Sequence, residues 1–174
     1  MGRGEPLERI SAYLRQGSDK SLAVIGPSGS GKSAVMARAV QAAGQTRSGA
    51  QIIARYIGAT PASSDLVQLL RNLVGEIRRR YPAQAATDAE IPFEFNPLLT
   101  ALYEALQRPT AGQPLWIILD ALDQLTASHQ AHALRWLPTT LPDHVRLVVS
   151  TALPQAEDRA PDSSDSQGYQ GRDS

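Results

Sequence analysis

The amino-acid sequence predicts an α/β fold in three layers, with a parallel β-sheet between two layers of helices. Short apolar runs that suit buried strands alternate along the chain with segments in which apolar residues recur every three or four positions. Alternation of this kind is typical of parallel sheets covered by helices on both faces. The 174 residues, of which 42% are hydrophobic, are enough for one domain with a buried core.

The composition excludes several classes of function. The chain has no cysteine, which excludes disulfides, iron–sulfur clusters, thiol catalysis and cysteine-ligated zinc. Its 17 basic and 17 acidic residues balance, so bulk charge gives no support for binding to nucleic acid or to an anionic membrane. No apolar run approaches the ~20 residues that span a bilayer, and the first residues contain no secretory signal. We therefore expect a soluble, cytoplasmic domain without a nucleic-acid or membrane partner.

The first half of the chain contains two predicted strands and three predicted helices. Residues 5–16 carry apolar side chains three and four positions apart, which predicts a short helix. The apolar run 22–25 suits a buried strand, and the good helix formers of 33–43 predict the next helix. Residues 51–57 are typical of a strand. Capping residues then precede 66–80, whose apolar spacing predicts an amphipathic helix.

The second half continues the alternation after a long loop. Asn96, followed by proline, is the predicted N-cap of a helix over 96–106. The continuous apolar run 115–119 predicts a strand that is covered on both faces. Residues 129–137 are weakly helical in pattern, and 145–151 form the last predicted strand.

The composition changes near residue 154. The segment 156–174 holds five acidic residues, two arginines and four serines, with one aromatic residue. Such a segment buries too little apolar surface to offset its ordering entropy. We therefore expect one domain over residues 1–153 and a disordered polar tail over 154–174.

A glycine-rich segment between the first predicted strand and the following helix matches the pattern G-x-x-x-x-G-K-S. Its glycines allow the backbone N–H groups to converge on phosphate oxygens, and the helix start aims its positive end at the same point. Lys32 is expected to reach the β- and γ-phosphates, and the Ser33 hydroxyl to bind Mg²⁺. A flexible linker would not run from a strand into a Lys-Ser helix start, and the last glycine of a serine-hydrolase elbow is missing. The predicted nucleotide-contacting residues are Gly26, Pro27, Ser28, Gly29, Ser30, Gly31, Lys32 and Ser33.

Two carboxylates follow the predicted strand 115–119. Asp120 stands at its carboxyl end, where ligands bind in open α/β sheets, and is expected to hold Mg²⁺ opposite Ser33. Asp123 lies one turn further and is expected to orient the attacking water or to take its proton. These two residues and Lys32 are the candidate catalytic residues. Ser150 or Thr151, at the end of the last strand, either faces the γ-phosphate or simply ends the strand with a polar residue.

At these residues the chain resembles the STAND class of P-loop NTPases, and within it the NACHT-type, nephrocystin-like branch. The resemblance covers about residues 2–153 and is carried by four segments: Gly2-Arg3 with Leu7-Glu8-Arg9, the loop 26–33, Tyr56–Pro61, and Leu119–Leu125 with the sequence LDALDQL. It implies a three-layer P-loop NTPase fold with strand order 2-3-4-1. It also implies ATP or GTP with Mg²⁺, slow hydrolysis, and a signalling switch that forms a homo-oligomer in the triphosphate state.

The chain departs from this family pattern in three respects. Many members have Asp-Glu where this chain has Asp123-Gln124, which reduces the carboxylates available to activate water. No arginine follows Ser150-Thr151. The fifth strand, the winged-helix region and the repeat domains of related proteins are absent, so we expect the strand before the phosphate loop to be an exposed edge.

Several functions remain open at this point. The motifs favour a nucleotide-switched signalling ATPase, whereas Gln124 and the missing arginine favour a nucleotide-binding interaction module that hardly hydrolyses. A small-molecule kinase is less favoured, because 81–95 contains acidic residues but no arginine-rich lid. Zero net charge disfavours a DNA-dependent ATPase. Three histidines are expected at the surface rather than as metal ligands, and nothing selects an arginine finger among Arg55, Arg135 and Arg146.

Overall fold

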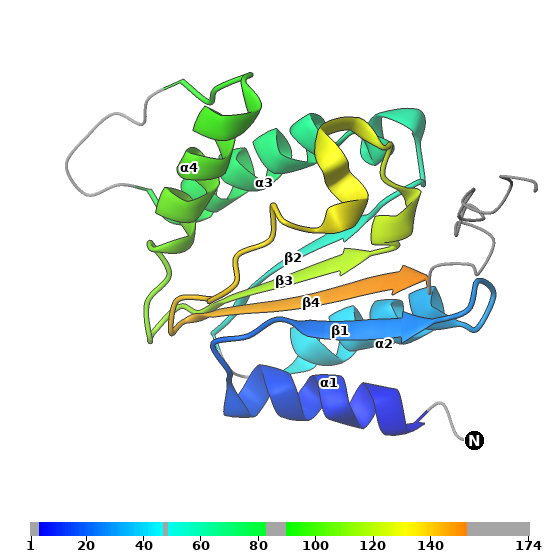
Figure 1. Cartoon of the computed structure of the whole chain (residues 1–174). Coiled ribbons are helices and arrows are strands. Elements are labelled where there is room, and N and C mark those ends of the chain that lie inside the picture. Colours follow the sequence, from blue (N-terminus) through cyan, green and yellow to red (C-terminus); the bar gives the residue numbers. More distant parts are fainter. Residues whose placement is uncertain (1–3, 47–48, 83–89, 153–174) are drawn as a thin grey trace, which may run out of the picture.

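Four parallel strands form the sheet (Figure 1). They are β1 (Leu22–Gly26), β2 (Gln51–Tyr56), β3 (Leu115–Asp120) and β4 (Val145–Ala152), and they lie in the order β1-β4-β3-β2. This is the expected order 2-3-4-1 and confirms the predicted fold class. The computed structural model describes residues 4–46, 49–82 and 90–152. The predicted polar tail lies outside these ranges.

Two helices cover each face of the sheet (Figure 1). On one face lie α1 (Gly4–Gln16) and α2 (Lys32–Gln45), which pack against each other. On the other face lie α3 (Leu66–Arg80) and α4 (Phe95–Leu106), which also form a pair. The result is the three-layer α/β/α arrangement that the alternating pattern predicts.

Strand β3 is buried along its whole length, as the continuous apolar run predicts. Its side chains alternate between the two layers because successive residues of a strand point to opposite faces. Ile117 and Leu119 belong to the core under α3 and α4, whereas Trp116 and Ile118 pack with α1 and α2. The strand therefore anchors both halves of the hydrophobic core and fixes the position of Asp120 at its end.

Helix α3 follows its sequence pattern closely. The Asp65 side chain accepts a hydrogen bond from the Gln68 N–H at 2.8 Å, so the predicted capping is present. Six apolar side chains of one face are buried: Leu66, Leu69, Leu70, Leu73, Val74 and Ile77. Burial of such side chains stabilises the fold by about 1.5–3 kcal/mol each.

The predicted N-cap of α4 is wrong. The helix begins at Phe95, with Glu94 in the cap position and no side-chain hydrogen bond from it. Asn96 therefore lies inside the first turn. The Phe95 ring packs against the core and stacks on His129 with 4.6 Å between ring centroids. We attribute the earlier start to this packing, which the local cap signal does not include.

Residues 129–137 also differ from a weak helix. The structure has a 3₁₀ segment over Ser128–Ala133, in which His129 and Gln130 both have a φ of 53°. Leu134 is left-handed as well, with a φ of 54°. Left-handed backbone is unfavourable for residues with a side chain, so this segment is held by its contacts rather than by its own preference. Trp136, for example, donates its ring N–H to the Ala131 carbonyl at 3.1 Å.

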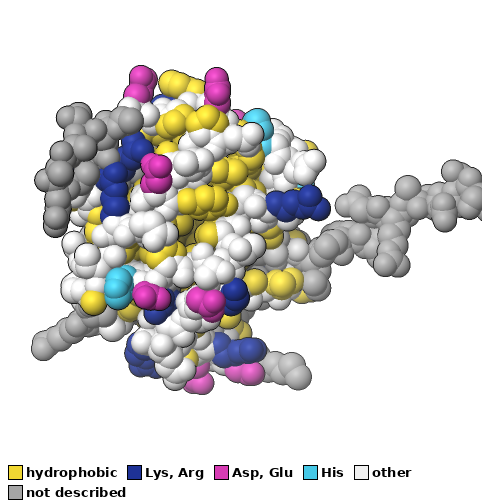
Figure 2. Space-filling model, turned by 60° about the vertical axis from the view of Figure 1, so that its left-hand side comes forward, with side chains coloured by type: hydrophobic (Ala, Val, Ile, Leu, Met, Phe, Trp, Pro, Cys, Tyr) yellow, Lys and Arg dark blue, Asp and Glu magenta, His cyan; other side chains and the backbone are white. Residues whose placement is uncertain are grey.

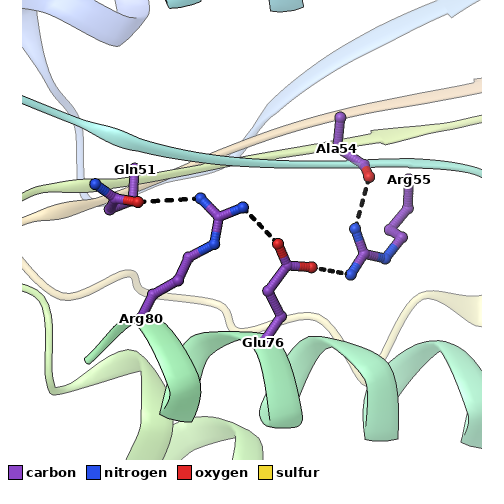
Figure 3. A network of polar contacts seen from close by, with 5 residues as sticks. All are labelled: Gln51, Ala54, Arg55, Glu76 and Arg80. Carbon is purple, nitrogen blue, oxygen red and sulfur yellow. Dashed lines mark hydrogen bonds and ion pairs between the residues drawn. The ribbon is translucent and has the colours of Figure 1, made fainter. Parts of the chain in front are cut away.

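An ionic network ties α3 to the edge strand β2 (Figure 3). Arg55 of β2 and Arg80 of α3 both contact the carboxylate of Glu76, and Arg80 also donates to the Gln51 side chain at 3.1 Å. Burial alone would raise the pKa of Glu76, but the two guanidinium groups lower it below its ordinary value. Arg55 is therefore engaged in holding the second layer of helices to the sheet.

Strand β1 is an edge strand among the described residues, as expected. Ile25 is 56% exposed there, and a groove of about 300 Å³ runs between the strand and the start of α1. Another face of the molecule shows hydrophobic side chains in its middle, with acidic, basic and histidine side chains around them (Figure 2).

Within the described ranges, no helix combines the length and apolarity that a bilayer crossing needs.

Candidate functional site

The glycine-rich loop joins the end of β1 to the start of α2, as predicted. Gly29 and Gly31 have φ values of 75° and 87°, which are backbone conformations that favour glycine. A Cβ atom built on either glycine meets no other atom within 4 Å, whereas one on Gly26 would lie 3.1 Å from Ser30 Oγ. The loop is thus curled tightly at its start and open to solvent at its tip.

Lys32 is folded back over this loop. Its Nζ atom donates to the carbonyl oxygens of Gly26 and Pro27, both at 2.8 Å. The ammonium therefore lies against the loop together with the free N–H groups that every helix start presents. Ser33 is exposed in the first turn of α2. A positive charge, the N–H groups of a helix start and an open loop suit a polyphosphate anion, so the residues present fit a nucleotide.

Asp120 lies at the carboxyl end of β3 with only 3% exposure. Its Oδ1 atom accepts a hydrogen bond from the hydroxyl of Ser150 in β4, the neighbouring strand. The Ser150 Oγ atom in turn accepts the Ala121 N–H at 2.8 Å. An ionised carboxylate has about four acceptor positions, so this contact leaves capacity for a cation. Oxygen donors from Asp120 and Ser33 are the ligand type that Mg²⁺ prefers, and they fit that ion.

The chain turns sharply after Asp120. Ala121 is left-handed, with a φ of 63°, and residues Leu122–Gln124 form one 3₁₀ turn. This turn presents Asp123, whose Oδ1 accepts the Ala152 N–H at 2.8 Å and whose Oδ2 accepts the Gln124 Nε2–H at 2.8 Å. The Asp123 side chain thus accepts a hydrogen bond from the last residue of β4, which extends past the end of β3.

The charge of Asp123 is stabilised in this position. Burial alone would raise its pKa, but the hydrogen bonds from Gln124 and Ala152 and the positive charge of Lys32 lower it below its ordinary value. Ala152, which donates to Asp123, pairs with Gly26, and the Gly26 carbonyl accepts from Lys32 Nζ. The structure brings together a cation on the phosphate loop and a carboxylate from the turn after β3.

The family follows from comparison with known proteins. A family model described as an AAA ATPase domain matches residues 1–150. The chain belongs to the AAA ATPase domain family. This membership supports nucleotide binding and ATP hydrolysis in general terms.

Curated relatives of this AAA ATPase domain include NACHT-containing proteins, which confirms the NACHT-type resemblance. The human NACHT and WD repeat domain-containing protein 2 is 35% identical over 100 residues, which cover 58% of this chain and 6% of that protein. The human NACHT domain- and WD repeat-containing protein 1 is 28% identical over 158 residues, which cover 86% and 10%. The chain thus spans a tenth or less of the length of these relatives.

A solved structure of the Aeropyrum pernix Orc1 protein in complex with DNA shares the fold of this AAA ATPase domain. The TM-score is 0.54 at 18% sequence identity, and the match covers 87% of this chain and 39% of that chain. At this identity the likeness shows the fold alone.

The structure gives Ser150 of this AAA ATPase domain a different contact from the predicted one. Its hydroxyl is fully buried and donates to Asp120. A direct contact between Ser150 and the γ-phosphate remains a prediction. Thr151 is partly buried, and its hydroxyl lies 3.4 Å from the Ala152 carbonyl.

Three contacts of the site are not evident from sequence reasoning. The Ala152 donor is a backbone N–H group, so the residue type at position 152 does not predict it, and only the folded sheet brings it to Asp123. Gln124 stands out in the sequence as a departure from Asp-Glu, but not as a hydrogen-bond donor to Asp123. Gly58, within one of the segments that carry the family resemblance, packs against Gln124.

The remaining candidates have other contacts. His129 stacks on Phe95, and the His132 ring lies 2.5 Å from the Leu125 carbonyl oxygen. In the part of the chain that the structure describes, no group of three or more His, Cys, Asp or Glu residues is placed to hold a metal. Arg146 donates to the Asp143 and Val145 carbonyls, while Arg135 is exposed.

Proposed function

We propose that the chain binds ATP, or GTP, with Mg²⁺ and hydrolyses it slowly as a nucleotide-controlled switch. The observation that carries the proposal is the open loop 26–33, over which Lys32 is folded, with Asp123 bound to the N–H of Ala152, the strand partner of Gly26. Family membership over residues 1–150 supports both the activity and a domain boundary near residue 153.

Each site residue has a defined part in this proposal. The loop amides and the Lys32 ammonium bind the phosphates, and Lys32 stabilises the charge that develops on the transferred γ-phosphoryl group. Ser33 and Asp120 hold Mg²⁺, which would neutralise charge on the β- and γ-phosphates. Asp123 orients the attacking water and accepts its proton, because its carboxylate can accept further hydrogen bonds besides those from Gln124 and Ala152. Ser150 orients Asp120 by donating to its Oδ1 atom.

A second function is favoured by the chemistry of Asp123. A carboxylate whose pKa is lowered is a weaker base, and Gln124 supplies no second carboxylate. Both features favour a nucleotide-binding interaction module with little or no hydrolysis. A small-molecule kinase has less support, because Arg71 next to the long loop is occupied with the Ile91 and Pro92 carbonyls.

Phosphate release and nucleotide binding separate these functions. The switch ATPase predicts slow release of phosphate that requires Mg²⁺ and is lost in Asp123→Ala, whereas the binding module predicts tight ATP binding with release equal to buffer. Transfer to any member of a metabolite panel would instead favour the kinase.

The broader role is proposed from the resemblance. We infer a homo-oligomer in the triphosphate state, and a signalling role alongside winged-helix and repeat domains such as the WD repeats that name the relatives. Balanced charge favours a function without nucleic acid or membrane, and a chain without cysteine suits the cytoplasm. Sedimentation with ADP and with a non-hydrolysable ATP analogue tests the oligomer, because a single species in both would exclude the switch.

A further inference from the structure

The segment after β2 is joined to the turn that carries Asp123. The Ile57 N–H donates to the Asp120 carbonyl at 3.0 Å, and the Thr126 N–H donates to the Ser64 carbonyl at 2.9 Å. Between these two contacts Gly58 lies against Gln124. The segment from residue 57 to residue 64 therefore supports the whole turn from one side.

Gly58 lies so close to Gln124 that a side chain at position 58 would crowd it. A Cβ atom on Gly58 would lie 3.0 Å from Gln124 Cβ and 3.2 Å from its Cγ, which is tighter than most real Cβ contacts, so the Gln124 side chain would have to shift. The φ of Gly58 is 82°, a conformation that disfavours any residue with a side chain. Gly58 thus lies beside the aliphatic part of the exposed Gln124 side chain, and a side chain at position 58 would crowd it.

The Gln124 side chain ends at Asp123. Gln124 donates its Nε2–H to Asp123 Oδ2, and the opposite amide orientation would place two oxygens against each other. The other carboxylate oxygen is held by the Ala152 N–H. With one donor on each oxygen, the carboxylate plane of Asp123 is fixed between the end of β4 and Gln124.

We propose that Gln124, which packs beside Gly58, is a positioning residue that fixes the Asp123 carboxylate beside the start of the phosphate loop, where the Lys32 ammonium lies. This inference rests on the proposed role of Asp123 in water activation. A glutamate at position 124 would repel Asp123 instead of donating to it. Gln124 therefore gives this chain an oriented single carboxylate in place of an acidic pair.

The test compares Gln124→Met with Gln68→Met in the full chain. Methionine keeps the length of the side chain and removes its amide, and Gln68 is exposed on α3 and is not among the hydrogen-bond donors to the Asp123 side chain. The first readout is the NMR titration of the Asp123 carboxyl carbon without nucleotide. The charged group that acts on it is Lys32, and the neutral donors are the Gln124 amide and the N–H groups of Ala152 and Asp123. Loss of the Gln124 donor raises its midpoint, and Gln68→Met leaves it unchanged.

The second readout is ATP turnover. Gln124→Met is expected to lower kcat about tenfold, the effect of a misplaced catalytic group, with KM unchanged. Gly58→Ala is expected to act in the same direction on both readouts. Its control is Gly49→Ala, which introduces the same left-handed strain at a φ of 69° but lies away from Gln124. Gly49→Ala therefore leaves the Asp123 midpoint and the turnover unchanged.

Asp123→Ala separates failure of the inference from failure of the proposed function. If Asp123→Ala abolishes turnover while Gln124→Met keeps the parental midpoint and kcat, the positioning inference alone is overturned. If Asp123→Ala turns over ATP like the parent, the water-activating role is overturned, and the positioning inference fails with it.

Discussion

At the scale of single residues, the site depends on hydrogen bonds that cross from one strand to the next. Asp120 and Asp123 both extend from the end of β3, and both are held by groups of β4, the Ser150 hydroxyl and the Ala152 N–H. Strand β4 also pairs with β1, which leads into the phosphate loop. The two carboxylates are therefore positioned relative to the loop through one strand.

Asp120→Asn tests the metal role at this scale. The amide keeps the shape of the side chain but removes its negative charge, so the residue loses its affinity for Mg²⁺. We expect nucleotide binding by the variant to become independent of Mg²⁺, as measured by thermal shift at fixed ATP with the ion varied. An unchanged response to Mg²⁺ would refute the assignment of Asp120 as a ligand.

Local patterns predict the residues of the site better than their contacts. The glycine pattern of 26–33 and the position of Asp120 after an apolar run are visible in the sequence, because they depend on neighbours along the chain. The contact of Ser150 with Asp120 depends on residues 30 positions apart. Which way that hydroxyl points is decided by the register of β3 with β4, and no local pattern contains it.

At the scale of elements, the helices are held to the sheet by apolar burial and, at the β2 edge, by the network around Glu76. The Glu76 side chain is 14% exposed and the arginines are about twice as exposed. The network is therefore intermediate between a surface ion pair and a buried one. Its pairing joins β2 to α3 and so supports the segment that leads from β2 to Gly58.

Glu76→Gln is expected to destabilise the fold by about 2 kcal/mol, between the values typical of exposed and buried pairs. Because the folded state lowers the pKa of Glu76 from its ordinary 4.5, this stabilisation is present above that pH and is lost as the pH falls through the lower folded value. Urea unfolding of parent and variant at pH 7 and at acidic pH measures both effects. An equal difference at the two pH values would contradict the account.

Element boundaries show where local signals are overruled. Asp65 caps α3 as its sequence predicts, because the cap and its partner are three residues apart. Asn96 does not cap α4, because the helix begins one residue earlier, at Phe95. We attribute this earlier start to the packing of Phe95 on His129, which is distant in sequence. Packing between distant segments likewise holds the left-handed residues of Ser128–Ala133, a conformation that sequence patterns do not predict.

At the scale of the whole molecule, the parallel direction of the strands puts the carboxyl ends of β1 and β3, which lead into the phosphate loop and the Asp123 turn, on the same side of the sheet (Figure 1). Alternation of strands and helices predicts the layers, but the order of the strands came from the family resemblance. Side chains from the two faces of β3 pack into the two halves of the core, so the strand that carries Asp120 is anchored on both faces. The binding of a polyphosphate by the loop 26–33 is the claim on which the other assignments depend.

Isothermal titration of ATP with Mg²⁺ into the parent, Lys32→Ala and Lys20→Ala tests this claim most directly. Lys20 is the other lysine of the chain and lies exposed, with contacts to Thr139 and Thr140. A charged hydrogen bond contributes about 1.5–3 kcal/mol, so Lys32→Ala is expected to weaken binding at least about tenfold, while Lys20→Ala binds like the parent. Equal affinity of folded Lys32→Ala and parent would contradict the account.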